Sequence, residues 1–219
     1  NHSQLFFKHL APTNPFPVGI EIDYAEGSWI YGPKGKWLDL IAGIAVCSVG
    51  HRHPNVVAAI HQQVDRYLHT MVYGEYVQDA NTRLAQKLTS LLPSTLDCVY
   101  LVNSGTEANE AAIKMARRAT GRSQIISFHK SYHGNTMAVS QLSSRKPPIG
   151  GYASHIRRIP APDTLRPVGG TADGQAAAFA RELQTAIDDL EATGHGFSGF
   201  LFCPTFANEG LPDLPQNFM

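Results

Sequence analysis

Residues 99–122 read VYLVNSGTEANEAAIKMARRATGR, and this stretch decides the fold that we expect. Its first four residues, 99–102, are apolar without alternation, which is typical of a strand buried on both faces of a parallel sheet. Ser104 and Glu107 form an S-x-x-E capping box, so a helix is predicted to begin just after Ser104. The stretch therefore predicts a buried strand, a tight turn and a capped helix.

The predicted helix has charges that agree with its dipole. Glu107 and Glu110 lie in its first turns, basic residues lie toward its end, and Gly121 stands where a C-terminal cap belongs. Residues at helical spacing form the stripe that we expect to be buried: Ala108, Ala112, Met115, Ala116 and Ala119.

The turn in front of this helix is suited to bind an anion. Between a buried strand and a helix, the N–H groups at Gly105 and Thr106 are left free and point toward one place, which favours a phosphate. Gly105 also lets an anion approach closely. The alternative is an ordinary capped helix after a strand, because capping signals are common.

Composition limits the classes of protein to be considered. The chain has 219 residues, 43% of them hydrophobic and 16% charged, and a formal net charge of zero, which is typical of a soluble globular protein and argues against nucleic acid or an anionic membrane as the main partner. No apolar run is long enough to span a bilayer, and no secretory signal is visible. Three widely separated cysteines, Cys47, Cys98 and Cys203, favour a reducing, cytoplasmic setting. His51 and His53 have no accompanying ligand set, so we expect no metal site.

The N-terminal region is predicted to be small and partly antiparallel. Residues 5–20 are expected to form an irregular arm, and short segments separated by turns over residues 20–40 predict a small meander. Pro54 is expected to open a helix, and a second helix follows a cap at Asp79 and stops at Pro93. The faces expected to be buried are Val57, Ile60, Val64, Tyr67 or Leu68 and Met71 in the first helix, and Leu84, Leu88, Leu91 and Leu92 in the second.

A second chemically distinctive region follows the strand predicted over residues 124–128, QIISF. Tyr132, His133 and Gly134 come directly after its end, at the rim where open α/β sheets bind their ligands. The alternative is a loop with a packed tyrosine.

The last part of the chain completes an α/β alternation. Residues 143–174 are rich in proline and glycine and are expected to form a long surface excursion, whose arginines either face an acidic ligand or are solvated. A helix is predicted over residues 175–192 and a buried strand over residues 199–203. We therefore expect a mostly parallel sheet with flanking helices over residues 51–219, after an arm and antiparallel segment over residues 1–50.

Three motifs together resemble one enzyme family. GIAVCSVGHRHP (43–54), SGTEANEAAIKMAR (104–117) and SYHGNT (131–136) are similar to the class III, ornithine-aminotransferase-like branch of the pyridoxal-phosphate enzymes of fold type I, in order and in approximate spacing. The similarity extends from about Phe16 to the end. The resemblance implies the large domain of this fold, with its C-terminal part missing from the chain.

The resemblance also implies roles for five residues. Gly105 and Thr106 would hold the phosphate of pyridoxal phosphate, with Ser104 bounding the turn. Tyr132 would stack on the pyridine ring, and His133 would lie beside it. By the same resemblance, the loop at residues 46–49 would approach the substrate pocket.

No catalytic residue is assigned. In this family the lysine that forms the Schiff base and the acid that partners the pyridine nitrogen come later in the chain, past Met219, so the 219-residue chain alone is expected to be inactive. None of its lysines stands in the context of that lysine: Lys8, Lys34, Lys36, Lys87, Lys114, Lys130 and Lys146.

The implied activity is amino-group transfer between an amino acid or amine and a 2-oxo acid, through a pyridoxal-phosphate Schiff base, in a homodimer. Two departures keep the substrate open, because Cys203 and Asn208 stand where relatives carry acids. The alternatives are a non-catalytic or regulatory half-fold that keeps the phosphate turn, and a lyase, decarboxylase or aminomutase on the same scaffold.

Overall fold

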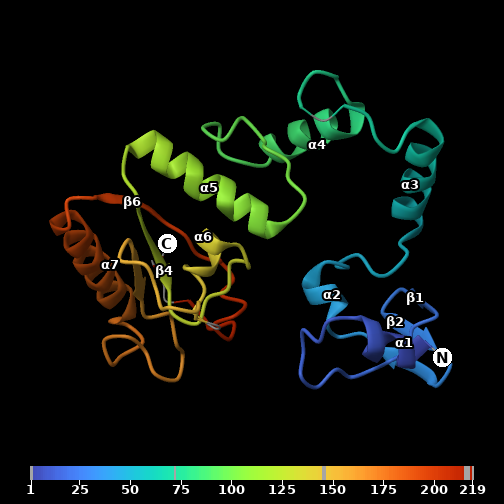
Figure 1. The fold of residues 1–219 in the computed structure, drawn as a ribbon, viewed down its shortest axis with the longest axis horizontal. Helices are drawn as coiled ribbons and strands as arrows, with labels where there is room; N and C mark the ends of the chain where they lie inside the picture. Colours follow the sequence, from blue (N-terminus) through green and yellow to red (C-terminus); the bar gives the residue numbers. More distant parts are fainter. Residues whose placement is uncertain (1, 72, 145–146, 215–217, 219) are drawn as a thin grey trace. The chain divides into compact units, whose positions relative to one another are not determined.

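The computed structural model describes residues 2–71, 73–144, 147–214 and 218. They fall into two compact units, Asn1–Gln86 and Lys87–Met219, whose elements are labelled in Figure 1. The domain boundary expected after residue 50 stays a prediction. Lys146 lies outside the described residues.

The first unit opens with a helix, α1 (His2–His9), so the expectation of an irregular arm is wrong for residues 5–9. A contact distant in sequence fixes this segment, because the backbone N–H of Ser3 donates to the Glu21 carboxylate at 3.0 Å. Local patterns cannot reveal such a contact.

The predicted meander is confirmed. Strands β1 (Tyr24–Glu26), β2 (Trp29–Gly32) and β3 (Gly35–Leu38) pair antiparallel in the order β1-β2-β3. The register places Tyr24 opposite Tyr31, and their rings stack with centroids 4.4 Å apart. Aromatic cross-strand pairs of this kind stabilise a small sheet.

The helices α2 (Ala42–Ala45), α3 (Pro54–Arg66) and α4 (Asp79–Thr89) follow. Proline opens α3 as predicted, and α4 ends before the expected stop. The predicted buried faces are wrong, because Ile60 is 58% exposed and Leu84 47% exposed. Within the described chain no other element packs extensively against α3 or α4, so their apolar faces stay accessible.

The second unit is built on a parallel sheet, as predicted. Its strands are β4 (Gln124–Phe128), β5 (Ile156–Ile159) and β6 (Phe197–Phe200), in the order β5-β4-β6. All five residues of β4 are buried. Strand β6 begins and ends earlier than the predicted segment at residues 199–203.

Helices cover both faces of this sheet (Figure 1). On one face, Ile125 packs with Ile113 of α5 (Gly105–Thr120) and with Val139 of α6 (Met137–Ser140). On the other face, Ile126 and Phe128 pack with α7 (Gln175–Ala192), whose bounds agree with the prediction. Adjacent residues of β4 thus point to opposite faces, which explains why both Ile125 and Ile126 are apolar and buried.

Two expectations for the opening stretch are wrong. Residues 99–102 form no strand, and Tyr100 is 72% exposed, because no described strand lies beside them to pair with their backbone. The buried face of α5 is also different, since Ile113 is buried whereas Met115 is 56% exposed. Of the predicted stripe only Ala116 is half-buried, and Ala108, Ala112 and Ala119 are exposed. Polar contacts of Asn109 and Glu110 with the loop after β4 fix this orientation of the helix.

The expected excursion over residues 143–174 is wrong where β5 lies. Two adjacent arginines interrupt the apolar pattern by which this strand could have been predicted from the sequence. Arg157 pairs with Asp189 of α7, whereas Arg158 reaches the opposite face and lies 3.3 Å from the ring centroid of Tyr152. Each guanidinium leaves the sheet on its own side, so the strand keeps its pairing.

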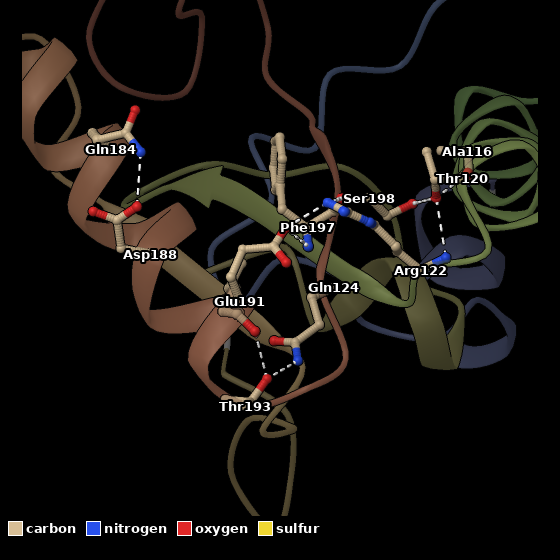
Figure 2. Close-up of polar contacts among 11 residues, drawn as sticks. Ala116, Thr120, Arg122, Gln124, Gln184, Asp188, Glu191, Thr193, Phe197 and Ser198 are labelled. Carbon is tan, nitrogen blue, oxygen red and sulfur yellow. Dashed lines mark hydrogen bonds and ion pairs between the residues drawn. The ribbon is translucent and has the colours of Figure 1, made fainter.

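Figure 2 shows the polar contacts at the edge of the sheet where the strands begin. Arg122 pairs with Glu191, Gln124 binds Thr193, and the hydroxyl of Thr120 lies 3.2 Å from that of Ser198. These contacts tie the end of α5 and the start of β4 to the end of α7 and the start of β6. The candidate site lies at the opposite edge of the sheet, where the strands end.

Candidate functional site

The N-terminus of α5 has the predicted cap. Ser104 is extended and its Oγ accepts the Glu107 N–H at 3.1 Å, while the Glu107 carboxylate accepts the backbone N–H of Asn103 at 2.7 Å. The carbonyl of Ser104 accepts the first helical hydrogen bond, from Ala108 at 3.0 Å. At the other end Gly121 caps the helix with φ 67°, as predicted.

Two backbone donors at this helix end remain available. Among the described residues, no acceptor binds the N–H groups of Gly105 and Thr106. A β-carbon at Gly105 would meet nothing within 4 Å, so the space beside it is open. Free N–H groups at the positive end of a helix dipole form a site for an anion.

The loop after β4, residues 129–136, is held against the first two turns of α5. The side-chain amide of Asn109 donates to the carbonyl of His133 at 2.7 Å, and the Thr136 hydroxyl donates to the Glu110 carboxylate. The backbone of Gly134, at φ 139°, lies against the side chain of Thr106. The structure thus brings the loop that carries Tyr132 and His133 onto the helix end formed by residues 104–106.

His133 is a buried, neutral imidazole with an unused ring nitrogen. His133 is only 8% exposed, and this burial holds the pKa of its imidazole below the usual range. Its backbone N–H donates to Ser143 Oγ at 2.9 Å, whereas its Nε2 is buried without a partner in the described chain. Tyr132, next to it, is 44% exposed. The neighbouring Ser131 hydroxyl, between the carbonyls of Phe128 and Leu142, fixes the start of the loop.

The segment after β6 contains the two departures from the family pattern. The Sγ of Cys203 lies 3.2 Å from Thr205 Oγ1. Burial raises the pKa of the Cys203 thiol, but hydrogen bonds, chiefly from the Ala207 backbone, outweigh burial and leave the pKa lowered. Glu209 follows Asn208, and burial raises the pKa of its carboxyl, whose Oε2 has no partner among the described residues. A half-buried acid is therefore present one residue after the position where an acid was expected.

Sequence reasoning missed two residues that build the site. Asn109 carries the contact between α5 and the loop, and Gly134 provides the close approach to Thr106. The available signal was the position of Asn109, which lies one turn after Thr106 on the same side of the helix. The roles expected for Ser104, Gly105, Thr106, Tyr132 and His133 toward a cofactor stay predictions.

Within residues 2–71, 73–144, 147–214 and 218, no cluster of three histidine, cysteine or acidic side chains is placed to hold a metal ion. No helix in the described part of the chain is long and apolar enough to cross a membrane.

The fold and the site define an α/β protein that presents a capped helix, with free N–H groups, to a loop at the carboxyl edge of a parallel sheet. The family model for aminotransferase class-III matches residues 11–215, and the chain belongs to this family.

Curated relatives agree with this assignment. An acetylornithine aminotransferase of Halalkalibacterium halodurans is 39% identical over 63% of this chain and 35% of its own length. The mitochondrial alanine–glyoxylate aminotransferase 2 homolog 2 of Arabidopsis thaliana is 36% identical over 87% of this chain and 39% of its own length. The chain thus spans little more than a third of these relatives.

Solved structures match almost the whole chain. A phospholyase from Arthrobacter in complex with phosphoethanolamine has 30% identity and a TM-score of 0.82 over 99% of this chain and 51% of its own. A taurine:2-oxoglutarate aminotransferase from Bifidobacterium kashiwanohense, in complex with pyridoxal phosphate and glutamate, has 25% identity and a TM-score of 0.81 over 100% and 50%. The predicted fold, part of a fold type I large domain, is confirmed.

Proposed function

We propose that this chain is part of a pyridoxal-phosphate enzyme that transfers an amino group between an amino acid or amine and a 2-oxo acid. The observation that carries the proposal is the free pair of N–H groups at the start of α5, held beside the loop of Tyr132 and His133 in a class-III family member.

The residues present fit the cofactor. The N–H groups of Gly105 and Thr106 are suited to bind its phosphate, and the helix dipole favours the negative charge. The accessible ring of Tyr132 offers a flat surface to a flat heteroaromatic ring. The unpartnered Nε2 of His133 is a buried polar atom that a bound group would satisfy.

Each of these residues contributes binding or orientation. When bound, pyridoxal phosphate supplies an electron sink for the carbon that carries the amino group. Asn109 holds the loop at the correct distance from α5, and Ser143 fixes the backbone of His133. Because burial keeps His133 neutral, it can offer a hydrogen bond without placing a positive charge beside the ring.

The substrate is proposed only as a class. The relatives named above act on different amino donors by their names, and this chain carries Cys203 and Asn208 where the family pattern has acids. We propose an amino donor and a 2-oxo acid as substrates, a homodimer as the assembly and the cytoplasm as the compartment. A lyase is the second candidate, because the phospholyase is a structural neighbour at 30% identity.

The proposed reaction is tested with the longest protein that contains these 219 residues. It is incubated with pyridoxal phosphate, an amino donor and a 2-oxo acid, and both products are quantified. Equal formation of the new amino acid and the new oxo compound supports aminotransfer. Release of phosphate or carbon dioxide without amino transfer supports a lyase or decarboxylase, and no reaction with any donor supports the non-catalytic alternative.

The 219-residue chain is tested separately. Without a lysine in the family context we expect weak or no cofactor binding and no turnover, measured by the visible absorbance of the cofactor after dialysis. Stable absorbance or any transamination by this chain would contradict that expectation. Sedimentation of the active protein tests the homodimer, and an active monomer argues against it.

A further inference from the structure

A loop of the first unit, residues 40–50, has an unusual backbone. Ala42, Gly43, Ile44 and Ala45 have φ of 49°, 62°, 61° and 61°, a left-handed turn. Side chains of L-residues clash with the backbone in this region, and the β-branched Ile44 is the least suited to it. Such a conformation persists only where the surrounding structure imposes it.

Asp39 holds the beginning of the loop. Its Oδ1 accepts the N–H groups of Ile41 and Ala42 at 2.9 and 3.0 Å. Its own N–H donates to the carbonyl of Ser28 at 2.8 Å, which anchors the residue to the turn between β1 and β2. The start of the left-handed turn is therefore tied to the meander.

His51 holds the end of the loop. Its Nε2 lies 2.7 Å from Asp39 Oδ2, and the two side chains are 19% and 7% exposed. Its backbone exchanges two hydrogen bonds with Gly27, at 2.8 and 3.0 Å. In the described chain His51 is the only basic side chain within 4.0 Å of the Asp39 carboxylate. Both ends of the loop thus meet at one contact.

Burial of the loop's own side chains does not offset its backbone strain. Ile41, Ile44 and Val49 are 70%, 85% and 67% exposed. Hydrogen bonds therefore hold the loop in this conformation. Three lie within its own backbone, from Ala45 to Ile41, from Cys47 to Ala42 and from Gly50 to Cys47, and the contacts of Asp39 and His51 tie its two ends to the meander.

We propose that the Asp39–His51 contact is a clasp that holds loop 40–50 in its left-handed conformation. The proposal stands on the geometry of the first unit alone.

Hydrogen exchange of the full chain tests the clasp. In Asp39→Ala and His51→Ala we expect the amides of residues 40–50 to exchange about tenfold faster, because local opening no longer breaks the clasp. Asp39→Asn keeps an acceptor for the two backbone N–H groups and His51→Gln keeps a donor, so both are expected to give smaller increases. The double alanine variant should exchange no faster than the faster single variant, since both remove the same contact.

Matched controls are available on α3. Asp65→Asn and His61→Gln change the same residue types on an exposed helix face and should leave loop exchange unchanged. Unchanged exchange in β2, which lies in the same unit as the clasp, shows that this unit remains folded in the variants. Wild-type loop exchange in both alanine variants overturns the clasp, and so do controls that accelerate the loop as much as the clasp variants.

Discussion

Gly134 lies so close to Thr106 that a β-carbon on Gly134 would be 2.9 Å from the β-carbon of Thr106. Real β-carbons do not approach this closely, and the φ of 139° at Gly134 also disfavours any side chain. The absence of a side chain is therefore what lets the loop after β4 rest on the helix end that carries the free N–H groups.

Gly134→Ala should separate the loop from α5. We expect a loss of about 3 kcal/mol in the free energy of unfolding, from steric overlap plus backbone strain, measured by urea unfolding. Gly150→Ala is the matched control, because its φ of 88° is strained but its β-carbon meets nothing within 4 Å, so it should lose only about 1 kcal/mol. Thr106→Gly in the Gly134→Ala background should recover part of the loss, and no recovery would argue against direct overlap.

Ser104→Ala removes the N-cap of α5 and should lower the free energy of unfolding by about 1 kcal/mol, because the Glu107 N–H loses its acceptor. Ser104→Gly should cost only a few tenths of a kcal/mol, since glycine is tolerated at this position. Faster hydrogen exchange at Glu107 reports the lost bond directly. Ser94→Ala, at an exposed serine in a turn, is the control and should change neither quantity.

Local signals account for the parts of the fold that the sequence predicted. The cap at Ser104 and the glycine at residue 121 each signal an end of α5 through residues that are close in sequence. Both ends of the helix could therefore be predicted without knowledge of what packs against it. The short, isoleucine-containing segment of β4 and the helical periodicity of α7 are equally local signals. The same reasoning placed residues 104–106 at the start of a helix and the loop of Tyr132 after a strand.

The errors arise where contacts distant in sequence decide. Arg157 and Arg158 obscure β5, because the sequence does not reveal that Asp189 and Tyr152 receive them on opposite faces. The orientation of α5 depends on Asn109, whose partner is a backbone carbonyl 24 residues away. A stripe of alanines therefore predicted the wrong buried face. In the site, the sequence identified the helix end and the loop, but not the residue that joins them.

The pH dependence of stability should include a contribution from His133. Because burial lowers its pKa in the folded chain, the unfolded chain binds a proton that the folded chain excludes as the pH falls through the usual histidine range. Stability should therefore be highest above about pH 7 and decrease toward about pH 5. His129 and His155 act in the same direction, each mainly through burial.

His133→Gln should flatten this decrease, measured as the urea midpoint at a series of pH values. NMR titration of the wild-type chain should give His133 a lower pKa than an ordinary exposed histidine. His61→Gln, on the exposed face of α3, is the control and should leave the slope unchanged. If the urea midpoint fell equally with decreasing pH in the wild type and in His133→Gln, His133 would be protonated as readily in the folded chain as in the unfolded chain.

Phe128→Ala should be the most destabilising of these changes. Its ring is 1% exposed and lies 5.0 Å from that of Phe200 and 5.1 Å from that of Phe206, so truncation leaves a cavity between the sheet and the loop after β6. We expect a loss of about 3–5 kcal/mol in urea unfolding, and a smaller loss for Phe128→Leu, which fills more of the space. Tyr100→Ala, at a ring that is 72% exposed, should stay within about 0.5 kcal/mol of the wild type. Similar losses for Phe128→Ala and Tyr100→Ala would mean that residues 99–102 are covered in solution and that the aromatic cluster around Phe128 is not the centre of the core.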